Sequence, residues 1–298
     1  MSEVASVSHT DLIHELRPSA QDVRVLEGGE INDVISVDQA EVFRFPKTES
    51  ARHNLRFEAT LLADVKGKTS LQIPAPIELT PDASHGVFSY VPGEVLDAHQ
   101  IAAFTDEEKT SLGRALATFI REVNAATTPA HIIELRSGLD PAFSDNAYYY
   151  DSMIKQGEKI GTQLLPVYKK YYERLKSLTG GSLPAPNMVT HGDLHTGNLL
   201  FHGHTLTGII DFGDCDAATI YNELRPLYRL DFDVVTAIIN DLNGAFGPVD
   251  PESLRLYAVT HELSILMRPE SQPPNESFRA RLSKELLTKW VGDNWSEL

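Results

Sequence analysis

The sequence is poor in the features that define several large protein classes. Its 298 residues include a single cysteine, Cys215, so no intrachain disulfide can form and a reducing compartment is expected. No run of about 18 apolar residues occurs, which predicts no membrane-spanning helix. The first ten residues are polar and lack the apolar core of a signal peptide. We therefore expect a cytoplasmic protein without a membrane partner.

Positive charge is also scarce. The chain has 26 lysine and arginine residues against 42 aspartate and glutamate residues, which gives a formal net charge of −16. A domain this acidic is a poor general binder of nucleic acid, so we expect no nucleic-acid partner. The same charge would attract cations, although many proteins are acidic for solubility alone. The content of 42% hydrophobic and 23% charged residues is ordinary for a globular protein.

The periodicity of the first third of the chain predicts a mixed α/β part. Apolar runs at 31–37 and 41–45 read as strands around a turn at Asp38-Gln39. Apolar residues that recur about every fourth position predict a helix over 50–65. A further strand is expected at 87–91, before the Pro-Gly dipeptide that follows it.

The remainder is predicted to be largely helical, with one long helical segment over 146–178 and a strand hairpin inserted at 199–210. Helix starts are expected at Thr105, Asp250 and Asn275. The Pro-Gly dipeptide is the expected hinge, within a linker near 90–94. We therefore predict an α+β protein with a first lobe at 1–93 and a helical lobe at 94–298. No pattern in the sequence specifies an oligomeric state.

Two short stretches carry the chemistry: HGDLHTGN at 191–198 and GIIDFGD at 208–214. Phosphoryl transfer needs a carboxylate that orients the attacking hydroxyl, and oxygen ligands that hold Mg²⁺ against a triphosphate. Asp193 and Asn198 can supply these groups from one loop, and Asp211 at a strand end would complete the metal site. We predict that Asp193 is catalytic and that Asn198 and Asp211 bind Mg²⁺.

Protein kinases use the same layout of an Asp, an Asn five residues later, and then Asp-Phe-Gly. Here Asp211-Phe212-Gly213 spells that tripeptide. Two features differ from protein kinases. His191 precedes a glycine instead of an arginine, and no activation segment or Ala-Pro-Glu follows the tripeptide. The pattern therefore indicates a kinase that does not act on proteins.

These motifs resemble the aminoglycoside phosphotransferase family, whose signature is His-Gly-Asp, four residues, Asn, and then Ile-Asp-Phe or Ile-Asp-Trp. The resemblance covers scattered landmarks from about residue 27 to 224. It implies a protein-kinase-like fold with a small antiparallel-sheet lobe, a larger mostly helical lobe, and the nucleotide between them. It also implies a small-molecule kinase that uses Mg²⁺ with ATP or GTP to phosphorylate a hydroxyl. The wording is most similar to the branch that phosphorylates the 2″-hydroxyl of aminoglycosides, then to macrolide phosphotransferases.

The resemblance implies a phosphate-binding role for Arg44, which stands where the family has a lysine, with Glu58 as its ion-pair partner. Arginine keeps the charge but presents a planar fork, so the phosphate geometry would differ. Strand alternation turns Arg44 away from the side of Phe43 and Phe45. A solvated Arg44 and a phosphate contact from Lys47 are the alternatives.

Further landmarks follow from the same resemblance. Gly28 and Gly29 are expected in the loop that covers the nucleotide, and Tyr90 and Val91 in the linker whose backbone reads the base. The family usually has an additional Asp after the metal-binding one. Here Glu223 is expected to replace that Asp in supporting the 191–198 loop.

The histidines near these motifs have less specific interpretations. We expect His191 to hold its loop through hydrogen bonds, without taking a proton in the reaction. His195, His202 and His204 could suggest a metal cluster, but histidines on the surface of a hairpin explain them more simply.

The acceptor is the least constrained part of the prediction. Asp231, Asp233 and Glu262 are candidate ligands for the ammonium groups of a cationic acceptor such as an aminoglycoside, although most helix carboxylates are merely solvated. The alternatives are a macrolide kinase, a kinase for a sugar, an amino alcohol or homoserine, and a non-catalytic nucleotide-binding module. The Asp-Asn-Asp set argues against the last alternative, because a binding module has no need of a catalytic Asp.

Overall fold

The computed structural model describes residues 9–26, 31–137, 146–181, 184–268 and 278–296. The chain forms two compact units, one made of Met1–Val95 with Leu199–Gly213 and the other of Leu96–Asn198 with Asp214–Leu298. Strands gather in unit 1 and helices in unit 2, so the predicted α+β class is confirmed.

Unit 1 holds a five-stranded antiparallel sheet with the strand order β1-β2-β3-β5-β4, and a three-stranded sheet with the order β6-β8-β9. Its elements are α1 (His9–Leu16), β1 (Val23–Leu26), β2 (Asn32–Val37), β3 (Glu41–Pro46), α2 (Glu49–Val65), β4 (Pro76–Leu79), β5 (Gly86–Ser89), β6 (Glu94–Val95), β8 (Leu199–His202) and β9 (Thr205–Ile209). The predicted turn between β2 and β3 is present, with positive φ angles of 52° at Asp38 and 49° at Gln39.

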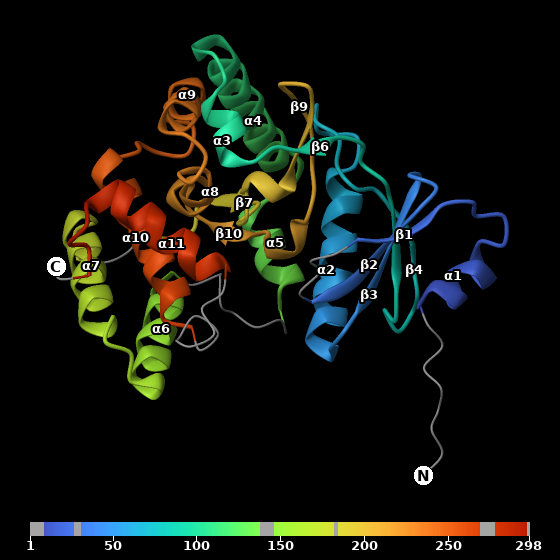
Figure 1. Cartoon of the computed structure of the whole chain (residues 1–298), viewed down its shortest axis with the longest axis horizontal. Helices are drawn as coiled ribbons and strands as arrows, with labels where there is room; N and C mark the ends of the chain where they lie inside the picture. The colour runs from blue at the N-terminus through green and yellow to red at the C-terminus, as the bar shows by residue number, and fades with distance from the viewer. Residues whose placement is uncertain (1–8, 27–30, 138–145, 182–183, 269–277, 297–298) are drawn as a thin grey trace. The chain divides into compact units, whose positions relative to one another are not determined.

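Strand β3 shows how side-chain alternation divides the larger sheet into two faces. Phe43 and Phe45 are buried in a cluster that includes Ile13 of α1. Arg44, between them, points to the opposite face and reaches Glu58 of α2. Helices α1 and α2 therefore cover opposite faces of the sheet (Figure 1). Helix α2 begins at a capping threonine, Thr48, whose side chain accepts the Ala51 N–H at 3.1 Å.

The β8–β9 hairpin groups with unit 1, whereas the division at 93/94 expected it in the helical lobe. The reason is backbone pairing: β6 pairs with β8, and Gln72 exchanges main-chain hydrogen bonds of 2.9 Å with Thr207 and Ile209. Val91 packs onto Gly208, where an added Cβ would lie 2.5 Å from the valine Cγ1. These partners lie far from the hairpin in sequence, so local periodicity could not reveal them.

Unit 2 is mostly helical. Its elements are α3 (Ala98–Ala102), α4 (Asp106–Ala126), α5 (Pro129–Leu135), α6 (Asn146–Ile160), α7 (Leu165–Leu178), β7 (Met188–Thr190), β10 (Asp216–Ala218), α8 (Ile220–Leu227), α9 (Phe232–Leu242), α10 (Pro251–Leu266) and α11 (Phe278–Val291). Among the described helices, none has the length and apolarity that crossing a membrane requires. The caps predicted at Thr105 and Asp250 are present, and Asn275 lies outside the described residues.

The long helical segment predicted over 146–178 is helical, and it is divided into two helices, α6 and α7. Gly161 has a φ of +67° and takes the left-handed conformation that ends α6. Pro166 then stands in the first turn of α7, where its missing N–H costs nothing. The apolar periodicity continues across the break because both helices pack into one tyrosine-rich core with α10 and α11.

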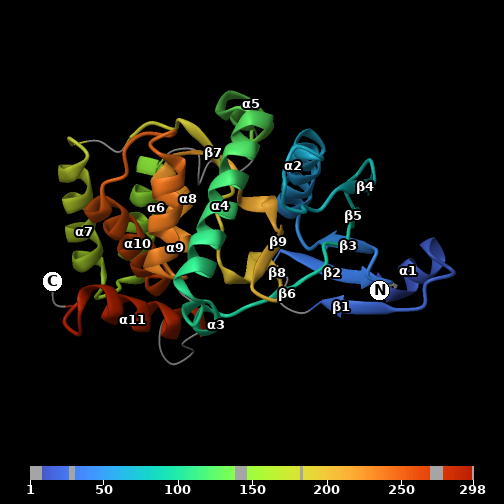
Figure 2. The same ribbon diagram turned by 90° about the horizontal axis from the view of Figure 1, so that it is seen from above.

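Two anchors hold the short strands that flank the 191–198 loop. Strand β7 pairs antiparallel with β10. Asn124 of α4 bonds both main-chain groups of Val189 in β7, each at 2.8 Å. Helix α4 also packs closely on α9, as both views show (Figure 1 and Figure 2). The 191–198 loop therefore leaves a strand that is fixed from two sides.

Candidate active site

In unit 1, Glu58 of α2 joins two predicted site segments. Its Oε2 atom pairs with Nη1 of Arg44 at 2.5 Å, and its Oε1 atom accepts the N–H of Phe212 at 3.0 Å. Both members of the pair are largely buried, with side-chain exposures of 11% for Arg44 and 3% for Glu58. The predicted ion pair is thus confirmed, and it also fixes the backbone beside Asp211.

Neighbouring carboxylates keep the Arg44 side chain positively charged. Burial alone would lower the pKa of Arg44, but the carboxylates of Glu58 and Asp211 raise it, so the guanidinium stays charged. Its planar group also lies over the ring of Phe88, 5.1 Å from the centroid. Lys47, the alternative phosphate ligand, is instead a half-exposed residue that pairs with Asp33 at 3.2 Å. The geometry therefore favours Arg44 over Lys47.

The Asp-Phe-Gly turn has an unusual backbone. Asp211 has a φ of +67°, a left-handed conformation that is uncommon for a non-glycine residue. Such strain persists where the surrounding structure enforces it, and it clusters at functional sites. Gly213 has a different reason to be glycine, because an added Cβ would lie 2.8 Å from the Asn54 side chain of α2. The turn is therefore held against α2 at Phe212 and Gly213.

In unit 2, the 191–198 loop places Asp193 beside His195. His195 Nδ1 accepts the Gly197 N–H at 3.0 Å, so its Nε2 can donate to Asp193 Oδ2 at 3.3 Å. Burial would raise the pKa of Asp193, but the hydrogen bond from His195 and the electrostatic interactions with His195, His191 and Arg229 lower it to about 2. Asp193 is therefore an ionised acceptor across the physiological pH range.

The interpretation of His195 as a surface residue is wrong. Its side chain is 30% exposed and contacts Asp193, whereas His202 and His204 are exposed as expected. The spacing of two residues between Asp193 and His195 was the available signal, but a loop's side-chain directions cannot be read from spacing alone. His191 is buried, and its Nδ1 accepts the Asp193 N–H at 3.4 Å, as expected for a structural histidine.

Asn198 closes the loop at its other end. Its side-chain nitrogen donates to the Asp193 carbonyl at 2.9 Å and lies 3.5 Å from Asp193 Oδ2. The nitrogen is thus directed inward to the loop, and the amide oxygen is the atom left to meet a ligand. Asp193 and Asn198 are accordingly brought together as predicted.

Glu223 of α8 binds the backbone of the same loop. This buried carboxylate accepts the N–H groups of His191 at 2.8 Å and Gly192 at 3.3 Å, which confirms its predicted supporting contact. Burial raises the pKa of Glu223 to about 7, although the two N–H bonds act in the opposite direction. Gly192 itself has a φ of +83°, and an added Cβ would lie 2.3 Å from the Asp214 carbonyl oxygen. This close approach explains the glycine of the His-Gly-Asp motif.

The chemistry of the donors fits Mg²⁺, which prefers oxygen ligands and few protein groups. Asp211 offers a carboxylate from unit 1, and Asn198 offers an amide oxygen from unit 2. The described residues contain no cluster of three or more His, Cys, Asp or Glu side chains that could hold a metal ion. Each of the two side chains nevertheless carries an oxygen of the kind that Mg²⁺ prefers.

Of the other residues predicted to contact the nucleotide, the structure describes two. The N–H of Tyr90 donates to the Ala40 carbonyl at 2.9 Å, so only its carbonyl is available to a base. Val91 is buried. Gly28 and Gly29 lie outside the described residues. The roles of these four residues in nucleotide binding stay predictions.

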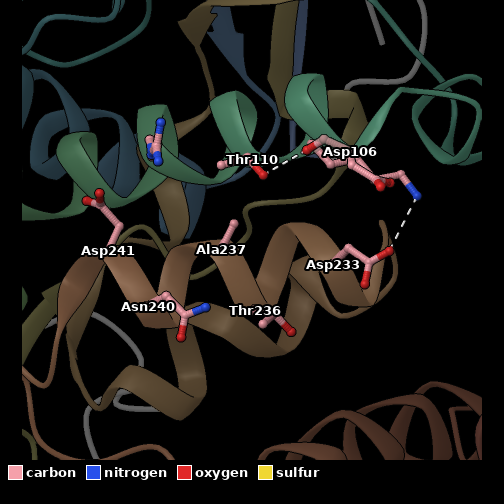
Figure 3. A pocket seen from close by; sticks show the side chains of 9 residues that line it. Asp106, Thr110, Asp233, Thr236, Ala237, Asn240 and Asp241 are labelled. Carbon is pink, nitrogen blue, oxygen red and sulfur yellow. Dashed lines mark hydrogen bonds and ion pairs between the residues drawn. The ribbon is translucent and has the colours of Figure 1, made fainter.

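Two of the three predicted acceptor carboxylates belong to the contact between α4 and α9. Asp231 caps α9 and pairs with Lys109 of α4 at 2.9 Å, and Asp233 lies 3.7 Å from the same ammonium. Asp233 also lines a pocket of about 530 Å³ with residues of α4 and α9, Thr236 among them (Figure 3). Their predicted role as acceptor ligands therefore gains no support from their position.

Glu262, the third, is buried in α10 and fully engaged. Arg229 binds it through two hydrogen bonds, at 2.6 Å from Nε and 3.0 Å from Nη2. Ser283 of α11 donates to the same carboxylate at 2.7 Å. The charge of Glu262 is thus compensated inside the protein.

Solved structures share this fold along almost the whole chain. The GDP and kanamycin complex of APH(2″)-IIia has a TM-score of 0.75 and 21% sequence identity, and the match covers 96% of this chain and 99% of that one. The streptomycin–ATP ternary complex of APH(2″)-IIa gives 0.71 and 19%, covering 95% and 99%. The macrolide 2′-phosphotransferase MphH from Brachybacterium faecium gives 0.64 and 15%, covering 93% and 97%. These likenesses confirm the predicted kinase-like fold.

The family is shown by one of two sequence comparisons. No curated protein sequence matches the chain significantly. A sequence model of the phosphotransferase enzyme family, APH, matches residues 22–257. This span includes the Arg44–Glu58 pair, the 191–198 loop and the Asp-Phe-Gly turn. The chain belongs to the phosphotransferase enzyme family and is accordingly a phosphotransferase with an alcohol group as acceptor.

Proposed function

We propose that this protein transfers the γ-phosphoryl group of ATP or GTP to a hydroxyl of a small molecule, with Asp193 as the catalytic residue. The observation that carries the proposal is the ionised Asp193 carboxylate, which His195 orients at 3.3 Å. The bond from phosphorus to the leaving nucleoside diphosphate breaks as the bond to the acceptor oxygen forms, and the hydroxyl proton passes to Asp193. Its pKa of about 2 suits a group that orients the hydroxyl more than one that removes the proton early.

The nucleotide phosphates are assigned to Arg44, which is held by Glu58, and the base to the linker at Tyr90 and Val91. Asn198 and Asp211 would hold Mg²⁺ through their side-chain oxygens. When bound, the ion neutralises phosphate charge as the phosphoryl group moves. Support comes from the amide nitrogen of Asn198, which binds back onto the loop, and from the left-handed backbone of Asp211. A cytoplasmic location stays a prediction from the sequence.

An aminoglycoside is one candidate acceptor, because similar structures contain kanamycin and streptomycin. A macrolide, a sugar, an amino alcohol or homoserine are the alternatives. A non-catalytic module that only binds nucleotide is disfavoured by the hydrogen bonds that orient Asp193, since binding alone does not require them.

The test is a coupled assay of nucleoside diphosphate release over a panel of hydroxyl compounds, with ATP and with GTP, on the wild type and Asp193→Asn. We expect acceptor-dependent release that falls by about 10²-fold or more in the variant, because the neutral amide cannot orient or receive the hydroxyl proton. Nucleotide affinity, measured by calorimetry, should stay within about twofold.

Near wild-type turnover in Asp193→Asn would contradict the assignment of the catalytic residue. Nucleotide binding without acceptor-dependent release for any compound would favour the binding module. Asp241→Asn is a matched control, since Asp241 pairs with Arg121 on the α4–α9 contact and has no proposed role in the reaction.

A further inference from the structure

An amide side chain, that of Asn54 in helix α2, lies beside the Asp-Phe-Gly turn. A Cβ atom added at Gly213 would lie 2.8 Å from Nδ2 of Asn54 and 3.7 Å from Oδ1 of Asp211. Helix α2 and the turn both belong to unit 1. The amide of Asn54 and the carboxylate that we assign to Mg²⁺ therefore border the same small space.

Helix geometry fixes the position of Asn54. It precedes Glu58 by four residues, so the two side chains lie on one face of α2. Glu58 accepts the Phe212 N–H at 3.0 Å, which holds the backbone of the turn against this face. Asn54 adjoins the next residue of the turn, Gly213. Its amide is thus placed beside Asp211 by the helix, without a hydrogen bond of its own.

The Asn54 amide has hydrogen-bonding capacity that its neighbours do not use. Asn54 is half-buried and forms no hydrogen bond within the described part of the chain. Asp211 is exposed, and its carboxylate accepts no hydrogen bond from the residues that the structure describes. Hydration by solvent is the simpler explanation for an asparagine of this kind. Here, however, an amide that can donate lies next to a carboxylate that can accept.

The chemistry of metal sites gives this pair a role. Carboxylates that bind a metal ion are themselves held by hydrogen bonds, and loss of such a partner typically costs about 10- to 100-fold in metal affinity. Two groups beside Asp211 can donate. Arg44 interacts with it electrostatically, but its guanidinium is paired with Glu58 and assigned to the phosphates. The Asn54 amide has no other assignment.

We propose that Asn54 is a positioning residue of the Mg²⁺ site. Its side-chain N–H donates a hydrogen bond to one oxygen of Asp211 when the ion is bound, which orients the other oxygen toward the ion. The inference rests on the proposed function, in which Asp211 is a metal ligand. Asn54 touches neither the acceptor nor the reacting atoms, so its loss should act on Mg²⁺ affinity and not on the binding of nucleotide without metal.

The test is Asn54→Leu, which keeps the approximate size of the side chain and removes its polar atoms. Calorimetry measures the affinity of the full chain for ADP in EDTA and over a series of Mg²⁺ concentrations. We expect the Mg²⁺ concentration that gives half of the metal-dependent gain in affinity to rise by about tenfold. The affinity for ADP in EDTA should stay within about twofold. Asn54→Gln keeps an amide and should restore part of the Mg²⁺ affinity.

Urea unfolding without nucleotide or metal separates positioning from a role in folding. The midpoint of Asn54→Leu should equal that of the wild type, because the amide makes no hydrogen bond to the described chain. A lower midpoint together with a weaker affinity for ADP in EDTA would show a structural role and overturn the proposal. His53→Leu is the matched control, since His53 is an exposed neighbour on α2 that pairs with Glu49.

Asp211→Ala in the same titration distinguishes this proposal from the proposed function. If Asp211→Ala weakens Mg²⁺ binding and Asn54→Leu does not, the positioning role is overturned and the assignment of the metal site stands. If neither variant changes the Mg²⁺ dependence, the metal site lies elsewhere and both proposals fail. Weaker Mg²⁺ binding in both variants, with His53→Leu unchanged, supports both.

Discussion

At the scale of single residues, the 191–198 loop concentrates four functions in eight positions. Gly192 allows the close approach to Asp214, Asp193 presents the carboxylate, His195 orients it, and Asn198 binds back onto the loop. Each residue depends on the next through a hydrogen bond or a backbone angle. Substitutions in this loop are therefore expected to act on turnover more than on stability.

His195 gives the first prediction at this scale. His195→Ala removes the donor to Asp193 Oδ2, so turnover should fall by about tenfold or more, while the KM of the nucleotide stays the same. His195→Gln can still donate from its side-chain amide and should retain part of the lost rate. The measurement is steady-state kinetics of the three proteins. If His195→Ala turns over like the wild type, the contact with Asp193 does not contribute to turnover.

Glu223 gives a prediction about pH. Because its pKa is raised to about 7 in the folded chain from an ordinary 4.5, its ionisation costs stability as pH rises between these values. Glu223→Gln keeps an oxygen for the His191 and Gly192 N–H groups and removes that cost. The unfolding free energy of the variant relative to wild type should therefore increase from about pH 5 to about pH 8, by on the order of 3 kcal/mol.

Urea unfolding at the two pH values provides this measurement. The matched control is Glu285→Gln, since Glu285 is exposed on α11 and should show no such trend. A difference between Glu223→Gln and wild type that does not change with pH would mean that Glu223 is not ionised with this pKa.

At the scale of secondary-structure elements, strand β3 and helix α2 together position Arg44. Alternation along β3 turns Arg44 toward α2, where Glu58 fixes it and also holds the Phe212 N–H. The sheet, the helix and the Asp-Phe-Gly turn are therefore coupled through one carboxylate. A change in the strand register by one residue would turn Arg44 to the side of α1.

The prediction for this strand and helix compares substitutions of Arg44 and Lys47. Arg44→Lys should weaken nucleotide binding by about tenfold, because the charge stays but the paired geometry is lost. Arg44→Ala should weaken it more and also destabilise the fold by on the order of 3–5 kcal/mol, because Glu58 is left buried and unpaired. Lys47→Ala should change both within experimental error, since its pair with Asp33 is half-exposed. Calorimetry with Mg²⁺-nucleotide and urea unfolding test the ranking. A larger effect at Lys47 would reverse the assignment of the phosphate ligand.

At the scale of the whole molecule, the binding of a ligand should raise the free energy of unfolding. A ligand that binds only the folded chain stabilises it by about 2.7 kcal/mol at a concentration of 100 times its dissociation constant. We expect Mg²⁺ with nucleotide to raise the thermal unfolding midpoint of the wild type, and EDTA to remove this gain. Asp211→Ala should lose most of the Mg²⁺-dependent part, because a carboxylate ligand of the ion is gone.

The control for this prediction is Asp214→Ala, which removes a neighbouring carboxylate that we do not assign to the metal. An Asp211→Ala variant whose midpoint rises with Mg²⁺-nucleotide as much as that of the wild type would move the metal site to other residues.

The fold class, several local elements and the family could be predicted from residues that lie close together in the sequence. The α+β class and the Asp38-Gln39 turn depend on residues that are neighbours in the chain, and so do the helix caps at Thr105 and Asp250. The family was likewise readable from two short motifs, because phosphoryl transfer uses few groups at nearly constant spacing.

Tertiary structure decided what depends on residues distant in sequence. It joined the β8–β9 hairpin to unit 1 through Gln72. It also brought His195, which was expected on the surface, into contact with Asp193. It also decided which charges a ligand could meet, because Glu262, a candidate ligand for a cation in the sequence, is paired with Arg229 inside unit 2. Net charge sums over the whole chain, whereas a ligand responds to the few groups that packing brings within hydrogen-bonding distance.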